Sequence, residues 1–303
     1  MSAGKYEEPE PEPRLAHAAH TLWPDEPYSL FNAKRFFSTD YRLARTFRGR
    51  GAYRYGYLLW LQQELEDEQR RDVCVFMSQT THTGVKDIDP EDPSFHPIEP
   101  LILDFTKDKK GLLTGAAGIE QQLKSCMEGG ARFVIGLVMI KWGGKMLGDA
   151  HDNALVIDFK KQAITRYEPN GGLVAEEVGW YAGEDFDEAL RNLFFNDIFR
   201  KIGIDHQGWI VNTTNEMCAQ PVQSTESRVD TFRLRDETAG YCAAWSMLFL
   251  HYRIMHPELS NKAAVREFCI KNSPEEMALM IRQYAAFIAS LRSDLDYHYF
   301  RDE

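Results

Sequence analysis

The sequence is poor in cysteine, and its cysteines do not stand at the spacing of a metal site. Its 303 residues contain five, and no Cys-x-x-Cys pair occurs among Cys74, Cys126, Cys218, Cys242 and Cys269. An odd number of scattered cysteines argues against both a zinc site and a disulfide framework. We therefore expect reduced thiols in an intracellular compartment, and no metal or cofactor.

Long apolar segments and net positive charge are also missing. No apolar run approaches the roughly 20 residues that span a bilayer, and residues 1–14 contain no apolar signal core. Neither a membrane protein nor a secreted protein is therefore expected. Asp and Glu number 46 against 35 Lys and Arg, for a formal net charge of −11. A chain this acidic is poorly suited to follow a phosphate backbone, so nucleic acid is not an expected partner.

Composition divides the chain into three predicted parts. Residues 1–27 alternate Glu with Pro in their first half and are predicted to be an acidic, Pro-rich disordered arm. Residues 28–100 are predicted to form an N-terminal extension with a helix over 56–70. The loop at 80–100, rich in Asp, Pro and His, is the predicted boundary. Residues 101–303 are predicted to form the main domain.

Patterns within the main domain predict a mixture of strands and helices. A continuous apolar run over 132–140 is typical of a strand buried on both faces. Shorter strands are predicted over 153–159, 163–167 and 209–211, the first two joined as a hairpin at Lys160-Lys161. Because these strands do not alternate regularly with helices, an α+β fold is expected.

Capping signals place three helices in the same domain. The first is predicted to run from Asp185 to about Ile202 and to stop at Gly203. The second begins near Cys242. Ser273-Pro274-Glu275-Glu276 supplies an N-cap, a proline at the first helical position and a capping glutamate for the third.

The most informative motif is Gly240-Tyr241-Cys242-Ala243-Ala244-Trp245-Ser246, which opens an apolar helical run. A cysteine in the first turn of a helix meets free backbone N–H groups and the positive end of the helix dipole, which both favour the thiolate. The ordinary role of a cysteine is that of a small core residue, and the other four are assigned such structural roles. Cys242 is the predicted nucleophile.

A thiol nucleophile needs a base, and the base needs a group that orients it. His151, just before the strand at 153–159, is the predicted base. Asp152 and Asp158 both lie an odd number of residues from His151. Since side chains alternate along a strand, these two carboxylates are expected on the opposite face.

The hairpin supplies a better partner for the histidine. If the chain turns at Lys160-Lys161, Asn153 lies opposite Glu168. Glu168 is then a diagonal neighbour of His151 on the same face, with Cβ atoms about 7 Å apart, which a long carboxylate can bridge. Glu168 is the predicted orienting acid, and Asn153 remains an alternative or a helper on that face.

Stabilisation of an oxyanion would complete such a site. The backbone N–H of Cys242 can supply one donor, and a Gln or Asn side chain commonly supplies another. The polar stretch upstream of Cys242 contains Gln223, which is preferred, and Gln220, which is the alternate.

In chain order, His151, Glu168, Gln223 and Cys242 resemble the catalytic set of the Ulp/adenain-like clan of cysteine proteases, which contains SUMO-specific proteases and the adenovirus protease. Three segments more closely resemble a variant of the clan from large DNA viruses: HDNALVID from His151, RYEPNG from Arg166 and GYCAAWS from Gly240. The likeness covers about residues 130–257. This sequence departs from the clan in three ways. Asp152 stands where Trp usually follows the histidine, Gly does not follow the cysteine, and Gln223 lies further upstream.

The resemblance implies a papain-like core preceded by an extension, and a viral, intracellular thiol protease or isopeptidase. Its substrate would be a polyprotein or a ubiquitin-like conjugate, cut after glycine, in the host cytoplasm or the virion. Two alternatives remain open. One is a YopJ-like protein acetyltransferase, which resembles the same clan. The other is a non-catalytic scaffold or virion protein that retains the fold.

Overall fold

The computed structural model describes residues 51–76, 78–79, 98–99, 101–104, 112–114, 118–141, 150–169, 183–212, 222 and 241–299. The predicted disordered arm lies outside these residues, as does most of the predicted boundary loop. Within the described part, the chain forms a mixed sheet with helices, and the fold is α+β.

A seven-stranded sheet forms the centre of the fold, in the order β5-β4-β6-β7-β8-β9, with β1 also paired to β6. One edge of β6 is shared, because β1 runs parallel to its first residues and β4 runs parallel to its last. A separate ribbon contains β2 and β3. The strands are β1 (Val73–Val75), β2 (Ser78–Gln79), β3 (Ile98–Glu99), β4 (Leu101–Asp104), β5 (Leu112–Thr114), β6 (Phe133–Lys141), β7 (Ala150–Asp158), β8 (Ala163–Tyr167) and β9 (Ile210–Asn212).

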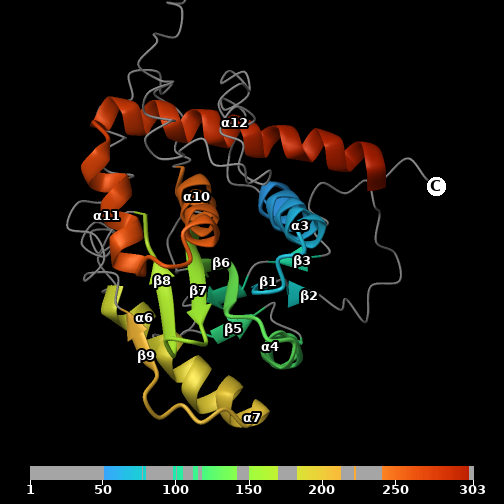
Figure 1. Ribbon diagram of the computed structural model, residues 1–303, viewed down its shortest axis with the longest axis vertical. Helices are drawn as coiled ribbons and strands as arrows, with labels where there is room; N and C mark the ends of the chain where they lie inside the picture. Colours follow the sequence, from blue (N-terminus) through green and yellow to red (C-terminus); the bar gives the residue numbers. More distant parts are fainter. Residues whose placement is uncertain are drawn as a thin grey trace, which may run out of the picture.

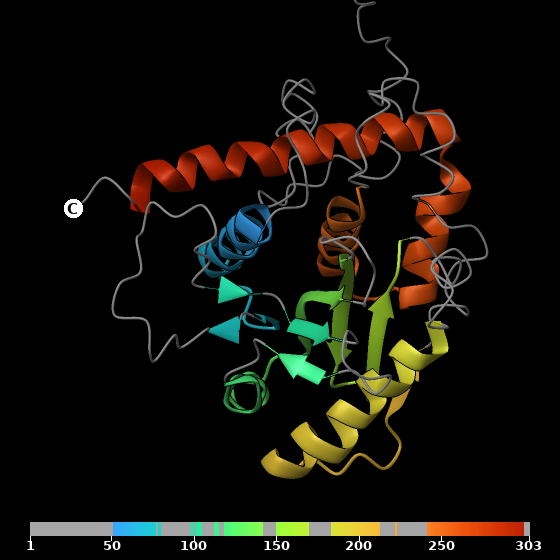
Figure 2. The same ribbon diagram turned by 180° about the vertical axis from the view of Figure 1, so that it is seen from behind.

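Helices cover both faces of the sheet (Figures 1 and 2). On one face lie α3, α10 and α12, and on the other lie α4 and the run from α6 to α7, while α11 connects α10 to α12. The helical segments are α3 (Gly51–Asp67), α4 (Ile119–Glu128), α6 (Gly183–Asn192), η4 (Leu193–Phe199, π-helical), α7 (Arg200–Ile202), α10 (Cys242–Met255), α11 (Asn261–Lys271) and α12 (Pro274–Tyr299).

Each face of the sheet has its own apolar core. Ala154 and Val156 of β7 pack with α3, α10 and α12, whereas Leu155 and Ile157 pack with α4, α6 and η4. Both faces of β7 are therefore buried, which explains why residues 154–157 form a continuous apolar run without alternation. Successive residues of β7 nevertheless face different cores, one on each side of the sheet. The polar residues of the strand therefore also point to opposite faces according to their position.

The predicted hairpin register is confirmed. β7 and β8 pair antiparallel from Asp158–Ala163 to Ala154–Tyr167, and the turn between them includes Lys160 and Lys161. The strand β7 begins at Ala150, so His151 lies inside the strand rather than just before it. The earlier start extends the pairing of β7 with β6 as far as Lys141.

The predicted helices are present with small shifts of their ends. Helix α3 starts at Gly51 instead of Gly56, and the helical run from α6 to α7 ends at Gly203, whose φ of 76° favours glycine. At α12, the capping box is formed: Ser273 N donates to Glu276 Oε2 at 2.7 Å, and Glu276 N donates to Ser273 Oγ at 3.2 Å.

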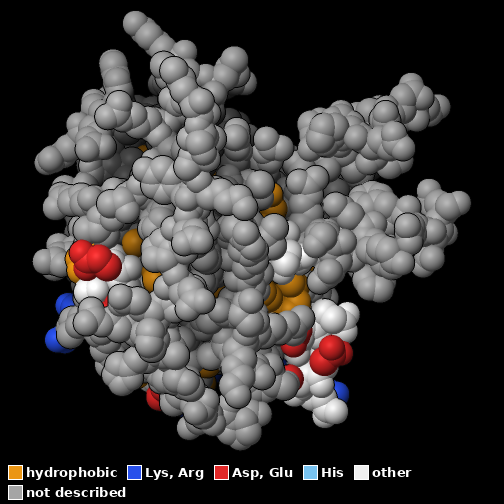
Figure 3. Space-filling view, turned by 90° about the horizontal axis from the view of Figure 1, so that it is seen from above, with side chains coloured by type: hydrophobic (Ala, Val, Ile, Leu, Met, Phe, Trp, Pro, Cys, Tyr) orange, Lys and Arg blue, Asp and Glu red, His pale blue; other side chains and the backbone are white. Residues whose placement is uncertain are grey.

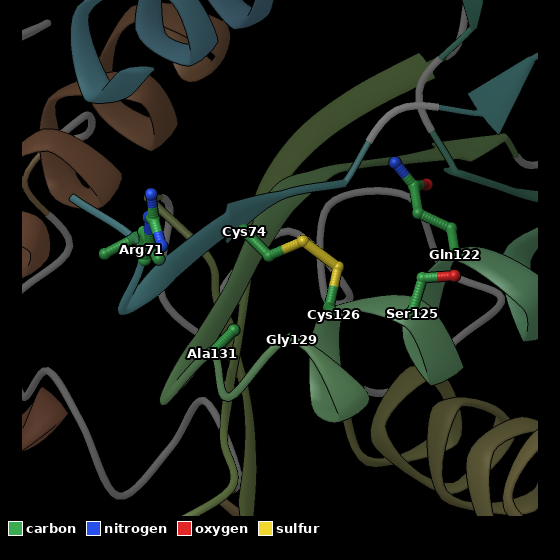
Figure 4. A pocket seen from close by; sticks show the side chains of 8 residues that line it. Arg71, Cys74, Gln122, Ser125, Cys126, Gly129 and Ala131 are labelled. Atoms are coloured by element: carbon green, nitrogen blue, oxygen red, sulfur yellow. A yellow bond between two sulfur atoms is a disulfide. The ribbon is translucent and has the colours of Figure 1, made fainter. Parts of the chain in front are cut away.

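The prediction that all cysteines are reduced is wrong for two of them. Cys74 of β1 and Cys126 of α4 form a disulfide, with Cα atoms 5.9 Å apart. The two cysteines are 52 residues apart, and neither α4 nor β1 was predicted, so nothing in the sequence indicated that they pair. A pocket of about 260 Å³ lies beside the disulfide (Figure 4), and none of the candidate catalytic residues is among its described lining.

The N-terminal extension contributes to the main core. Tyr57 and Leu61 of α3 are fully buried in the core that contains α10, and α3 packs along α12. The boundary near residue 100 stays a prediction, but α3 and β1 belong to the same packed sheet-and-helix unit as the residues that follow it.

Among the described helices, none is long and apolar enough to cross a membrane. On the face seen in Figure 3, the described acidic and basic side chains lie in small groups.

Candidate active site

His151 and Glu168 are brought together by the hairpin. Nε2 of His151 contacts Oε1 of Glu168, and both side chains are more than nine-tenths buried. Glu168 directly follows Tyr167, the last residue of β8, and the Tyr167 ring stacks on Phe249 of α10 with centroids 4.3 Å apart. The end of β8 is thus held against α10, which positions the carboxylate beside the imidazole.

Cys242 is the first residue of α10. It is a free cysteine, and its side chain is partly exposed. The first turn of the helix contains no acidic residue, so the positive end of the helix dipole is not cancelled there. The Cys242 side chain acts on the pKa of His151 by charge and hydrogen bonding, so the sulfur lies near the imidazole whose Nε2 faces Glu168.

The environment of His151 favours its charged form. Burial by itself lowers the pKa of the imidazole, but the charges of Glu168 and Cys242 and hydrogen bonds to both raise it, and the net pKa lies well above the usual value. His251 shows the opposite case. Its Nδ1 lies 2.9 Å from the Tyr284 hydroxyl, and burial lowers its pKa well below the usual value. The two buried histidines therefore have opposite pKa shifts because only His151 contacts a carboxylate.

This difference predicts a distinct titration of the two rings by NMR. We expect His151 to remain protonated above about pH 6.5, and Glu168→Gln to lower its midpoint because the variant removes the charge that favours the imidazolium. His251, as the control, should stay neutral in both proteins. Because the folded-state pKa is raised, the stability from His151 is complete below about pH 6.5 and falls as pH rises through the raised value. An unchanged His151 midpoint in Glu168→Gln would contradict this account.

The buried guanidinium of Arg166 lies beside the Glu168 carboxylate. Arg166 Nη1 lies 3.6 Å from Glu168 Oε2, while its Nε donates to Asp187 Oδ1 of α6 at 2.8 Å. The same Nη1 donates to Asn153 Oδ1 at 2.5 Å. The amide oxygen of Asn153, the alternative partner for the histidine, is therefore directed to Arg166. Arg166 and Asp187 were not predicted as site residues, although Arg166 lies two residues before Glu168 and so shares its face.

The two aspartates expected to face away from His151 do so. Asp152 is paired with Arg54 of α3. Asp158, at the far end of β7, lies 3.6 Å from Arg132 and accepts a hydrogen bond from the backbone N–H of Lys161. Strand alternation thus separates Glu168 from these nearer carboxylates, as predicted.

Comparison with protein-family models gives no match, and comparison with curated proteins gives none either. The site must therefore be judged by its own geometry.

Gln223 and Gln220 lie outside the described residues, so the second oxyanion donor stays a prediction. Val222, between them in sequence, is buried in the core that also contains Tyr241 and Ala243. No group of three His, Cys, Asp or Glu side chains that could hold a metal ion occurs in the described part of the chain. The assembled set is thus a thiol at a helix start, an imidazole and a carboxylate, which suits acyl transfer through a covalent intermediate.

Proposed function

We propose that this protein is a thiol protease or isopeptidase with a papain-like core of the Ulp/adenain-like kind. The observation that carries the proposal is that the His151 imidazole contacts the Glu168 carboxylate, while the charge and hydrogen bonding of the Cys242 thiol act on the same ring and raise its pKa. A thiol is activated when a base lies beside it and an acid orients that base. Its chain order agrees with the resemblance.

The reaction divides into two acyl transfers. His151 takes the proton of Cys242, and the sulfur attacks the carbonyl carbon, so that a C–S bond forms and the carbonyl electrons move to oxygen. The Cys242 backbone N–H and the Gln223 amide receive that oxyanion. When the oxyanion collapses, the C–N bond breaks and the leaving amine takes the proton from His151.

The second transfer returns the enzyme to its starting state. His151 removes a proton from water, the hydroxide attacks the thioester carbonyl, and the C–S bond breaks. The product acid leaves and Cys242 recovers its proton. Glu168 holds the imidazole in one orientation during both steps and stabilises its charged form. The substrate class proposed is a polyprotein or a ubiquitin-like conjugate cut after glycine.

The proposal predicts that Cys242 reacts selectively with electrophiles. At neutral pH, we expect iodoacetamide to alkylate it faster than Cys218 or Cys269, read by peptide mass spectrometry, because Cys242 lies at a helix start and interacts with His151. Ubiquitin-like proteins with a C-terminal electrophile should form adducts at the same residue. Equal alkylation of all three cysteines would overturn the enzymatic proposal. Acetylation of a target protein from acetyl-CoA without proteolysis would favour the acetyltransferase instead.

A further inference from the structure

One hydrogen bond joins the strand of the candidate base to the helix of the candidate nucleophile. Ser246 Oγ of α10 donates to the backbone oxygen of Asp152 in β7 at 3.0 Å, and both residues are buried. Asp152 directly follows His151, so their Cα atoms are about 3.8 Å apart. Ser246 lies four residues after Cys242, which places the two side chains on the same face of the helix, about 6 Å apart along its axis. The bond therefore lies close to both reactive residues.

The bond lies where β7 has only one neighbouring strand. β7 pairs with β6 over its whole length, from Ala150 to Asp158, whereas its pairing with β8 begins at Ala154. Within the described residues, His151 and Asp152 therefore have a strand neighbour on one side only. The apolar packing of α10 on β7 is non-directional, but a hydrogen bond has a defined length and direction. The Ser246 hydroxyl thus fixes the position of α10 along this end of β7.

Asp152 is a firm anchor for this bond, because its side chain is held from a third element. Arg54 Nε of α3 lies 2.5 Å from Asp152 Oδ1, and Nη2 lies 2.6 Å from Oδ2. The exposed fractions of the two side chains are 12% and 2%. A guanidinium bound to both carboxylate oxygens defines a position and an orientation, which a single contact does not give. Asp152 is therefore held by α3 through its side chain and by α10 through its backbone.

We propose that Ser246 is a positioning residue of the site, which holds the start of α10, and with it Cys242, at reacting distance from His151. It acts through the backbone of Asp152 and touches no reacting atom. The catalytic meaning of this assignment rests on the proposed function, but the effect of Ser246 on the thiol and the imidazole needs no substrate.

Ser246→Ala tests the assignment, because it removes the donor and leaves the reactive residues in place. The readouts are the rate of Cys242 alkylation by iodoacetamide at neutral pH and the midpoint of the His151 titration by NMR. We expect alkylation to slow severalfold, toward the roughly tenfold loss expected where the histidine is absent. The His151 midpoint should fall, because the charge and hydrogen bonding of Cys242 help to raise the pKa of that ring.

Tyr57→Phe is the matched control, because it removes a buried hydrogen bond to the same helix from a different element. The Tyr57 hydroxyl of α3 donates to the backbone oxygen of Met247 at 2.9 Å. The control should lose stability in urea unfolding much as Ser246→Ala does, yet keep the alkylation rate and the His151 midpoint of the wild type. A merely structural role of Ser246 would change these readouts alike in both variants, which would overturn the inference.

A second comparison asks whether Ser246 acts through the histidine. On a His151→Ala background, Ser246→Ala should leave the alkylation rate of Cys242 unchanged, because no imidazole remains to be positioned. Equal slowing with and without the histidine would mean that the serine acts on the thiol by another route, and the inference would be overturned.

The outcomes separate the two proposals. If Ser246→Ala keeps the wild-type alkylation rate and His151 midpoint, the inference is overturned while the protease proposal stands. If wild-type Cys242 reacts no faster than Cys218 and Cys269, the proposed function fails, and the His151 midpoint alone decides the inference. Slower alkylation together with a lower midpoint, both absent from the control, supports the inference.

Discussion

Cys242→Ala is expected to lower the rate of peptide or isopeptide cleavage by about 10³-fold or more, because no thioester can form without the sulfur. The change removes a small, partly exposed side chain at the first residue of α10, so circular dichroism and the thermal midpoint should stay close to those of the wild type. Cleavage is measured with a conjugate ending in glycine. Cys218→Ala is the matched control and should retain full activity.

The partners of Cys242 should follow an order set by their contacts. His151→Ala removes the base and should cost about as much as removing the nucleophile, with no further loss in the double variant, because the two act as one unit. Glu168→Gln keeps both the nucleophile and the base and should lose less than either of those variants, because the orienting acid acts only through the imidazole. Undiminished cleavage by Cys242→Ala would refute the assignment of the nucleophile.

Arg166→Met is expected to destabilise the fold by about 3–5 kcal/mol, because it leaves buried carboxylates without their cation. The Arg166 side chain is 1% exposed, and its two acidic neighbours, Glu168 and Asp187, are also buried. Urea unfolding followed by tryptophan fluorescence measures the loss. Since Glu168 then lacks support, the remaining folded protein should also cleave more slowly.

A compensating variant tests the cause of that loss. Arg166→Met with Asp187→Leu removes the main ion pair as a unit and should recover much of the stability, since apolar residues of similar volume replace buried ion pairs at little cost. Arg70→Met is the matched control. Its partner Asp72 is 42% exposed, so that carboxylate stays hydrated when the cation is removed, and the effect should be within about 1 kcal/mol. Equal losses for Arg70→Met and Arg166→Met would contradict the role given to burial.

The contact between His151 and Glu168 was predictable because it depends on local rules. The turn at Lys160-Lys161 sets the register of β7 and β8, and strand alternation then places the two side chains on one face. The start of α10 at Cys242 was predictable for a similar reason: the Gly-Tyr turn precedes a continuous apolar run. Neither inference required knowledge of distant parts of the chain.

Contacts between distant segments were not predictable. Asp152 could be excluded as the partner of His151, but its own partner is 98 residues upstream in α3. The disulfide between Cys74 and Cys126 was not predictable either, because it depends on how α4 packs beside β1. Polar residues such as Arg166 carry no periodic signal of burial, and only the packing of α6 against β8 shows that Asp187 meets it.

The sequence by itself therefore determined the α+β class and the hairpin register, because turn chemistry and strand alternation act over a few residues. It also predicted the thiol, the imidazole and the carboxylate of the proposed site. Only the tertiary structure decided that the thiol lies near the imidazole, that Arg166 lies beside Glu168, and that α3 brings Arg54 to Asp152. These contacts join segments that are far apart along the chain, and burial of two apolar cores, one on each face of the sheet, is what holds them together.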